Sequence, residues 1–575
     1  MKRALFFSTV IAIASSIAII DSLVCLAQGS KYGQFAPPDA FEDDPKLAYY
    51  GSENEWSRRQ FSKEKAEKES KRRGQRVLLE TMDGNPTAAL VWAAEYLAED
   101  PDDLESIFNQ VVAYSQLGQI DEAFAAMKQA VDGGLPVERF LAGPRQLLKP
   151  LTESKEFQDF VRDRTSGLIH GPMLGYVTDH SARIWVRTEN ETLVTVQVYT
   201  CDSTGKPTNN VASKRSALSD PQMDFTAMVD VAGLQPNTRY VYDVLIDNKS
   251  VLAGDLPQLH TFPTPGTPGR FSAAFGGGAG FMPDHERMWD TIATRDPDAL
   301  FLLGDNVYID LPEEPRGLHQ YTYYRRQSQP DFRRLTASTP VYAIWDDHDA
   351  AMDDVWLGPY HDRPAWKPAM LRIFKQNWVN PSYGNEESPG CWFKATFGDV
   401  DCFFLETRYF RTNPFGKDPT MLGAIEKAWL LAELNKSKAP FKVIISSVPW
   451  APNAKPGSHD TWDGFPQERE EIFQWIESNK INGVLLLSAD RHRSEAWKIE
   501  RPNGYPLYDL MSSKLTNEHT HECVPGPLFC YNKLCSVGMV TFDTTVADPT
   551  ITYEIVNIDN EVIDTLEIKL SQISF

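Results

Sequence analysis

The feature that most constrains this chain is a short, wholly apolar run that ends in a glycine and an acidic loop. Residues 300–303 have the composition of a strand buried on both faces, and Gly304 ends it. Asp305, Asn306 and Tyr308 follow at once. Ligands bind at the mouths of buried strands in open α/β sheets, and carboxylate oxygens suit hard cations. The stretch therefore predicts an α/β domain with a cation site, although Asp and Asn also favour ordinary turns.

Two further strand-to-loop junctions carry the same kinds of side chain. The apolar run at 341–345 is followed by an acidic segment that contains Asp347 and His348. The run at 484–487 is followed by a segment that contains Asp490 and His492. One acidic strand end is ordinary, but three of them predict a shared site at one edge of a sheet.

These segments resemble those of the PhoD-like alkaline phosphatase family, a branch of the calcineurin-like metallophosphoesterases. The matching segments are residues 304–308, 345–349, 406–411, 455–464, 490–492 and 508–517. The resemblance extends from about residue 165 to 545 and keeps the family order. It implies a four-layer α/β/β/α metallophosphoesterase domain over residues 270–575, within an α+β multidomain chain. It also implies hydrolysis of phosphoesters with Fe³⁺ and Ca²⁺ as cofactors.

The resemblance and the ligand chemistry together predict five metal-binding residues. Asp305 has two oxygens and can bridge two cations. A phenol such as that of Tyr308 becomes a ligand when a strongly charged ion removes its proton, which favours ferric iron. The second site is rich in oxygen and suits calcium. The predicted ligands are Asp305, Tyr308 and His492 for iron, with Asp347 and Asp490 for calcium.

Two further residues are predicted to act on the substrate. His348 is expected to be the acid or electrostatic group near the leaving oxygen, as in the family. Arg408 follows a predicted strand, and an arginine fork can bind a phosphate in two places. A structural salt bridge is an equal alternative for Arg408. His459, Asp460 and Arg491 are expected either to line the pocket or to be wall residues.

The sequence departs from the family at the glycine-rich turn 276–280. The family pattern places a Cys ligand near Gly278, and glycine has no side chain to donate. Four alternatives remain open at this stage: water fills the position, Asp284 or His285 reaches in, the backbone amides of the turn bind phosphate, or the site is crippled.

The N-terminal region has the composition of a targeting segment followed by a linker. Residues 1–27 are predicted to be a signal peptide, with Lys2 and Arg3 before an apolar run. This predicts a secreted or periplasmic protein, exported by general secretion because the basic pair is not a twin arginine. Residues 28–83 are highly charged and predict a solvated linker with some helix. No other segment is apolar enough to span a membrane.

Two smaller domains are predicted before the phosphatase domain. Residues 84–164 have helical periodicity and a tetratricopeptide-like pattern at Tyr114, Gly118, Ala123, Met127 and Ala130. Further helices are expected at 88–98 and 137–148. The segment is interpreted as a helical spacer, with binding of a protein partner as the alternative. Residues 165–264 alternate with period two and predict a fibronectin- or Ig-like β-sandwich, closed by the Pro/Gly linker 263–269.

Charge and cysteine content narrow the classes of function. The formal net charge of −22 argues against a surface that binds nucleic acid or an anionic membrane. A phosphorylated substrate is still allowed, because bound cations reverse the sign of the local electrostatic field.

Beyond Cys25 there are six further cysteines: Cys201, Cys391, Cys402, Cys523, Cys530 and Cys535. Up to three disulfides fit an oxidising compartment, and the last three cysteines are spaced for one local clip. A zinc knuckle is disfavoured because no CxxC is present.

Two functions from different classes follow. The first is a secreted, metal-dependent phosphomonoesterase or phosphodiesterase. The alternative is a non-catalytic scaffold with a degenerate phosphatase domain and a partner-binding helical segment. Retention of the predicted ligands favours the enzyme, and the Gly278 departure keeps the scaffold open. The pattern does not rank monoesters against diesters, because that preference depends on pocket shape.

Overall fold

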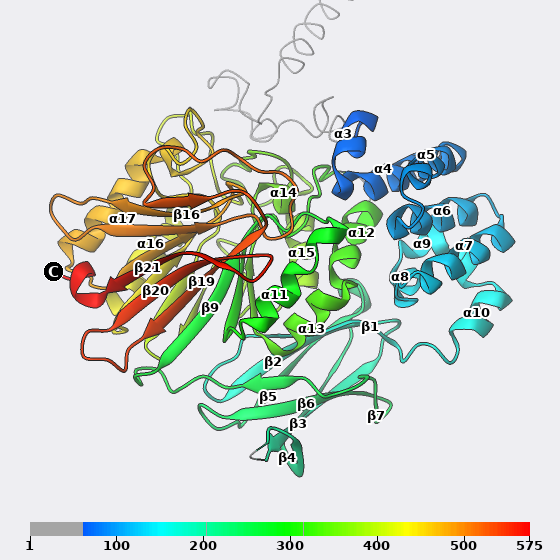
Figure 1. Ribbon diagram of the computed structural model, residues 1–575, viewed down its shortest axis with the longest axis horizontal. Coiled ribbons are helices and arrows are strands. Elements are labelled where there is room, and N and C mark those ends of the chain that lie inside the picture. The colour runs from blue at the N-terminus through cyan, green and yellow to red at the C-terminus, as the bar shows by residue number, and fades with distance from the viewer. Residues whose placement is uncertain (1–60, 203, 314–315) are drawn as a thin grey trace, which may run out of the picture.

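The computed structural model describes residues 61–202, 204–313 and 316–575 (Figure 1). The predicted signal peptide, 1–27, and the first part of the predicted linker, 28–60, lie outside the described residues. Within the described part of the chain, none of the helices has the length and apolar character needed to cross a membrane.

Two mixed β-sheets form the centre of the molecule. The first, with nine strands among the described residues, runs in the order β21-β20-β19-β9-β10-β11-β1-β2-β5. Its strands are β1 (Leu168–Gly175), β2 (Ser181–Thr188), β5 (Thr226–Ala232), β9 (Arg270–Gly276), β10 (Ala299–Leu303), β11 (Val341–Ile344), β19 (Ser536–Asp543), β20 (Thr550–Asn557) and β21 (Val562–Lys569). The second, with seven described strands, runs in the order β12-β13-β14-β15-β17-β16-β18. Its strands are β12 (Phe393–Phe397), β13 (Val400–Phe404), β14 (Phe441–Ile445), β15 (Val484–Ser488), β16 (Ser494–Ile499), β17 (Leu507–Ser512) and β18 (Phe529–Tyr531).

Aromatic side chains pack the two sheets against each other. Phe271 of β9 stacks on Phe397 of β12 with ring centroids 4.4 Å apart, and Phe301 of β10 meets Phe404 of β13 edge-on at 5.1 Å. The three apolar runs noted in the sequence form β10, β11 and β15, and every residue of these strands is buried. The prediction of three doubly buried strands is therefore confirmed.

Helices cover the outer faces of both sheets (Figure 1). The helices α11 (Met288–Thr294), α12 (Arg316–Gln327), α13 (Pro330–Ser338) and α15 (Lys367–Asn377) lie on the side of the nine-stranded sheet. The helices α16 (Gly423–Lys436) and α17 (Pro466–Ser478) lie on the side of the seven-stranded sheet. Trp289 of α11 packs on Phe332 of α13, with centroids 5.0 Å apart. The order of layers is helix, sheet, sheet, helix.

The β-domain predicted at 165–264 is not a separate unit. Its strands β3 (Leu193–Cys201), β4 (Pro207–Leu218), β6 (Arg239–Ile246), β7 (Lys249–Ser250) and β8 (Gln258–His260) form their own sheet. Its other strands, β1, β2 and β5, continue the nine-stranded sheet, because β1 pairs in parallel with β11 between Gly175 and Val341. The linker 263–269 therefore separates the β-domain from the phosphatase domain along the sequence, but strands from both sides of it belong to one sheet. This pairing also covers an edge of β11 that would otherwise be open.

A helical unit precedes this β-domain. Its helices are α3 (Lys63–Lys68), α4 (Ser70–Met82), α5 (Pro86–Glu99), α6 (Leu104–Gln116), α7 (Ile120–Asp132), α8 (Glu138–Ala142), α9 (Arg145–Thr152) and α10 (Lys155–Val161). Ala123, Met127 and Ala130 of α7 are fully buried. The single helix expected at 137–148 is instead two, because Gly143, with φ of 120°, and Pro144 interrupt it. The tetratricopeptide identity stays a prediction.

The predicted linker does contain helix, as expected, but the prediction that it is solvated is wrong for residues 70–82. This stretch forms α4, in which Lys71, Arg72 and Gln75 are 5%, 1% and 0% exposed. A Cβ atom at Gly74 would lie 2.0 Å from the hydroxyl oxygen of Tyr321 in α12, so the glycine permits a very close approach of the two helices. The charged composition suggested solvent exposure because Lys and Arg are seldom buried unless they are paired, as they are here.

Cysteine pairing is local. Cys523 and Cys530 form a disulfide that closes the loop before β18, as expected for a short clip among the last three cysteines. Among the described residues, Cys201, Cys391, Cys402 and Cys535 are free thiols, and all of these except Cys201 are buried.

Candidate metal centre

Strand ends from both sheets meet at one place. The loops after β10 and β11 come from the nine-stranded sheet, whereas the loop after β15 comes from the seven-stranded sheet. The expectation of a single sheet edge is therefore corrected: the site lies between two packed sheets. Asp305, Asp490 and His492 have φ of 52°, 70° and 47°. Left-handed backbone at residues other than glycine costs energy and tends to cluster at functional sites.

Most of the predicted metal ligands gather around Asp305. Ligand atoms of Asp305, Asp347 and His348 all lie within 4.8 Å of one another. The hydroxyl of Tyr308 donates to Asp305 Oδ2 at 3.0 Å, and His492 Nε2 lies 3.7 Å from the same oxygen. The structure thus brings together four of the five predicted ligands and the predicted acid, His348.

Asp490 lies beside a second acidic group. Its Oδ2 is 3.8 Å from Nζ of Lys455, which contacts Asp354 Oδ1 at 2.7 Å. Ligand atoms of Asp347, Asp353 and Asp354 also lie within 4.8 Å of one another. Sequence reasoning missed Lys455, Asp353 and Asp354. The two aspartates stand just beyond the matching segment 345–349, and their adjacency was the available signal.

The donor set fits cations. Burial and the neighbouring carboxylates Asp346 and Asp347 raise the pKa of Asp305 well above its usual value. Burial, with Asp305 beside it, likewise raises the pKa of the Tyr308 phenol. Among the described residues, Asp305 Oδ1, Asp490 Oδ2 and His492 Nδ1 are buried without a hydrogen-bond partner. Bound cations would stabilise these crowded oxygens and supply partners for the orphaned atoms.

His348 is held by a charged chain that begins in α4. Its Nδ1 lies 2.6 Å from Asp310 Oδ1, and the other oxygen of Asp310 forms an ion pair with Arg72. Burial opposes the charged form of His348, but Asp310 outweighs it and raises the pKa of His348 well above its usual value. Neither Asp310 nor Arg72 was singled out from the sequence, because neither lies in a matching segment.

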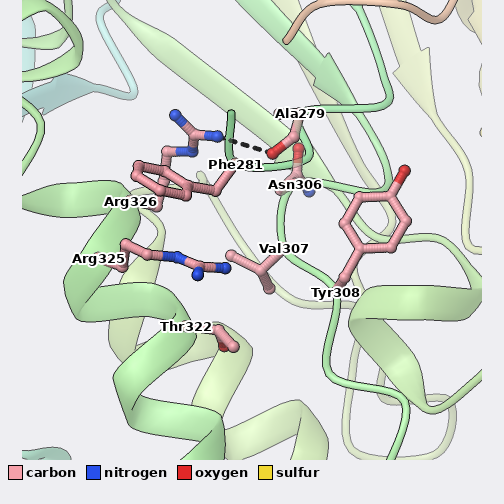
Figure 2. Close-up of a pocket in the computed structure, with 8 residues that line it drawn as sticks. All are labelled: Ala279, Phe281, Asn306, Val307, Tyr308, Thr322, Arg325 and Arg326. Atoms are coloured by element: carbon pink, nitrogen blue, oxygen red, sulfur yellow. Dashed lines mark hydrogen bonds between the residues drawn. The ribbon is translucent and has the colours of Figure 1, made fainter. Parts of the chain in front are cut away.

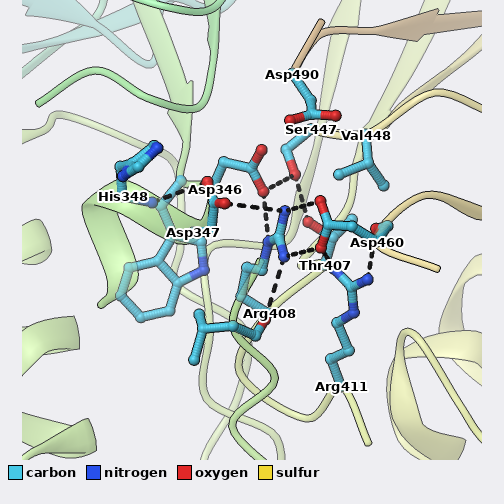
Figure 3. A network of polar contacts seen from close by, with 12 residues as sticks. Asp346, Asp347, His348, Thr407, Arg408, Arg411, Ser447, Val448, Asp460 and Asp490 are labelled. Atoms are coloured by element: carbon cyan, nitrogen blue, oxygen red, sulfur yellow. Dashed lines mark hydrogen bonds and ion pairs between the residues drawn. The ribbon is translucent and has the colours of Figure 1, made fainter. Parts of the chain in front are cut away.

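Arg408 is committed to other protein groups (Figure 3). Its Nη1 and Nη2 meet the carboxylate of Asp460 at 2.6 and 3.1 Å, its Nε donates to Asp346, and Nη1 also donates to the carbonyl of Val355. The side chain is fully buried. The predicted phosphate contact is therefore wrong, and the structural salt bridge is the observed alternative. Asp460, in turn, is a wall residue that holds Arg408.

The glycine turn after β9 has no room for a ligand. A Cβ atom at Gly278 would lie 2.4 Å from the carbonyl oxygen of Ser513, so a cysteine does not fit this backbone. The amides of Gly278 and Ala279 donate to the carbonyls of Gly304 and Asp305 at 3.2 and 2.8 Å, which removes them as phosphate donors. His285 faces the carbonyl of Thr516 at 3.2 Å, and Asp284 is exposed. Neither of these two side chains takes the missing position.

Asn517 is a further residue at the centre. Its Nδ2 donates to the Tyr308 hydroxyl at 2.5 Å, so the phenol oxygen is held between Asn517 and Asp305. Asn517 belongs to the matching segment 508–517, which was the signal that could have identified it.

A small pocket lies behind the loop 305–308 (Figure 2). Its lining residues are Ala279, Phe281, Asn306, Val307, Tyr308, Thr322, Arg325 and Arg326. Arg326 donates to the carbonyl of Ala279 at 2.7 Å, and the Tyr308 hydroxyl points away from both arginines. The Tyr308 hydroxyl, which belongs to the ligand cluster, therefore points away from the arginine side of this pocket.

Two packed sheets with acidic and histidine donors at their strand ends form a candidate metal centre. Residues 273–529 match the PhoD-like phosphatase family, and residues 165–263 match a domain of unknown function, DUF7800. Residues 273–529 are thus similar to the PhoD-like phosphatase family, as the resemblance seen in the sequence predicted.

Individual relatives show the same similarity. Alkaline phosphatase D of Bacillus subtilis (strain 168) is 24% identical over 350 residues, which cover 53% of this chain and 59% of the relative. The chain thus spans less than two thirds of that relative. A solved structure of PhoD has a TM-score of 0.57 at 17% identity, covering 70% of this chain and 90% of that one. The purple acid phosphatase PPD1 of yellow lupin has a TM-score of 0.52 at 13% identity, covering 70% and 75%. The two structures share the fold.

Proposed function

We propose that the protein is a secreted hydrolase that cleaves phosphoesters with the help of a two-metal site. The observation that carries the proposal is the meeting of Asp305, which follows β10, with Asp347 and His348, which follow β11. Their ligand atoms lie within 4.8 Å of one another. The similarity of residues 273–529 to the PhoD-like phosphatase family supports the same class of reaction.

The donor chemistry supports a division of the ligands between two ions. Tyr308 and His492, both beside Asp305 Oδ2, suit a ferric ion, because a phenol binds as phenolate to a strongly charged metal. Asp347 and Asp490 offer only oxygen and suit calcium. Asp305 would bridge the two sites. The chemistry that such a pair supplies is polarisation of phosphoryl oxygens and activation of water.

His348 is proposed to give a proton to the leaving oxygen of the substrate. Its Nδ1 is engaged by Asp310 at 2.6 Å, whereas Nε2 has only a longer contact, 3.7 Å to Asp353 Oδ1, and is the nitrogen that can face a substrate. Asp310 fixes the orientation of the imidazole and favours its protonated form. Arg72 holds Asp310 in turn through their buried ion pair.

The proposal of export rests on the N-terminal sequence. Residues 1–27 have a basic start, an apolar run and a small residue at the end, as a signal peptide requires. The disulfide between Cys523 and Cys530 also suits an oxidising compartment outside the cytosol.

The experiment that tests the proposed function is hydrolysis of p-nitrophenyl phosphate and bis(p-nitrophenyl) phosphate by the purified protein. We expect turnover in the presence of iron and calcium, loss after chelation, and loss in Asp305→Ala. Asp284→Ala, which removes an exposed aspartate near the turn, is the matched control and should keep full activity. If the folded, metal-loaded protein hydrolyses neither ester, the proposal of a hydrolase is wrong, and a non-catalytic scaffold becomes the proposed function.

A further inference from the structure

The helix α4 lies against the metal centre, although it is outside the part of the chain that matches the phosphatase family. Figure 1 shows it at the junction between the blue helical unit and the green helix α12. The Nζ atom of Lys71 is 4.1 Å from the ring centroid of Tyr308 and 3.4 Å from Asn517 Oδ1. The hydroxyl of that same ring donates to Asp305. The ammonium group of Lys71 is therefore one aromatic ring away from the bridging carboxylate.

The backbone around Lys71 is firmly positioned. Gln75 Nε2 donates to the carbonyl of Tyr308 at 2.6 Å, and Arg325 Nη2 donates to the carbonyl of Lys71 at 3.1 Å. Arg72 forms the buried ion pair with Asp310. Three attachments within residues 71–75 thus fix α4 to the loop that carries Asp305 and to α12. A side chain on this turn is placed as reproducibly as one on the phosphatase domain itself.

The ammonium group of Lys71 is buried but only loosely satisfied. Its contacts with Asn517 Oδ1, at 3.4 Å, and Glu69 Oε2, at 3.5 Å, are both longer than a good charge-assisted hydrogen bond. Glu69 is shared, because it also accepts a hydrogen bond from Lys65 at 2.9 Å and lies 3.7 Å from Arg72. Lys71 therefore keeps donor capacity for an anion bound beside Tyr308.

We propose that Lys71 selects phosphomonoesters over phosphodiesters by donating to the phosphoryl group of the substrate. The inference rests on the proposed hydrolase and names its substrate class. A monoester carries one more negative charge than a diester at neutral pH, so a nearby ammonium group stabilises it more strongly. Lysine binds phosphate as a point charge. The helical unit then acts in catalysis by supplying a specificity residue that the phosphatase domain lacks.

The test compares two esters in three variants. Lys71→Met removes the charge and keeps the apolar stem, Lys71→Arg restores a cation, and Lys68→Met makes the same neutral change at an exposed position three residues away. We expect Lys71→Met to lower the ratio of kcat/KM for p-nitrophenyl phosphate to that for bis(p-nitrophenyl) phosphate by about 10- to 100-fold, mainly through KM. Lys71→Arg should recover most of the ratio, and Lys68→Met should leave it unchanged.

An equal loss with both esters, which leaves the ratio of their kcat/KM values unchanged, would mean that Lys71 only supports Tyr308 and would overturn the proposal. The absence of any loss would overturn it as well. Calorimetry also measures the binding of inorganic phosphate to the metal-loaded protein, and this measurement does not depend on turnover. We expect about tenfold weaker binding in Lys71→Met. If the wild type hydrolyses neither ester, the hydrolase fails, and unaltered phosphate affinity in the variant would end the role of Lys71 as well. Lys71→Gln serves the same comparisons if the methionine variant does not fold.

Discussion

The guanidinium of Arg408 and the carboxylate of Asp460 meet fork to fork, with Nη1–Oδ1 at 2.6 Å and Nη2–Oδ2 at 3.1 Å. Both side chains are fully buried. Because the remaining donor of Arg408, Nε, reaches Asp346, the pair ties the loop after β13 to the loop after β11 and to the segment 455–464. The arrangement holds the walls of the metal centre together.

The first prediction is that Arg408→Gln is a stability variant. Arg411 and Lys455 still pair with Asp460 in this variant, but the buried carboxylate of Asp346 loses its cationic partner. The free energy of unfolding should therefore fall by about 3–5 kcal/mol. KM of the folded enzyme should stay within a few-fold. Urea denaturation and steady-state kinetics measure the two quantities. Arg334→Gln, which breaks an exposed ion pair with Asp290, should cost less than about 1 kcal/mol. A stable variant with a greatly raised KM would restore the phosphate contact for Arg408.

The second prediction concerns the metal-free protein and pH. Burial raises the pKa of Asp346 to about 8, of Asp349 to about 7 and of Asp353 to about 6, against a usual value of 3.8. The native state therefore binds more protons than the unfolded chain between pH 4 and 8, and stability contributed by these protons is lost as the pH rises through that window. The melting temperature of chelated protein should fall from pH 5 to pH 8.

Iron and calcium should flatten this slope, because cations replace protons as partners of the carboxylates. Calorimetric melting of chelated and reloaded protein at each pH measures the difference. A chelated protein that becomes more stable from pH 5 to pH 8 would contradict the assignment of this carboxylate cluster to cations.

The third prediction is a trade between function and stability at Asp305. The carboxylate is buried with Oδ1 lacking a hydrogen-bond partner, so Asp305→Asn should raise the stability of metal-free protein by about 1 kcal/mol or more while abolishing metal binding. Elemental analysis and urea denaturation check the two parts. Asp284→Asn is the exposed control and should change neither. An Asp305→Asn protein that retains both metals would remove the bridging role.

The sequence was sufficient for features that depend on local pattern. The doubly buried strands β10, β11 and β15 follow from uninterrupted apolar runs, and Asp305, Asp347 and His492 follow from their position directly after those strands. The meeting of two different sheets at the site could not be read in this way. Strand order depends on long-range pairing, such as that of β1 with β11, and no local pattern specifies it.

Charged residues were the harder part. An arginine after a strand has the same local pattern whether its partner is a phosphate or, as for Arg408, the distant Asp460. The charged residues of α4 suggested a solvent-exposed segment, because their partners, Asp310 and Asn517, lie more than two hundred residues away along the chain. Burial of these charges is decided by tertiary pairing, which composition does not record.

The last prediction concerns the docking of α4 on α12. A Cβ atom at Gly74 would lie 2.0 Å from the hydroxyl of Tyr321, which donates a hydrogen bond to Glu105 at 2.5 Å. Gly74→Ala should therefore lower the free energy of unfolding by about 1–3 kcal/mol through overpacking, even though alanine is the better helix former. Gly317→Ala is the control in α12, because its Cβ would meet its nearest neighbours at an ordinary 3.5 Å.

Adding Tyr321→Phe to Gly74→Ala removes the oxygen nearest to the new methyl group. The double variant should be more stable than the sum of the two single changes predicts, because the residues couple through one contact. Urea denaturation gives the four free energies, and limited proteolysis reports release of the helical unit. Strict additivity would show that α4 does not press on Tyr321.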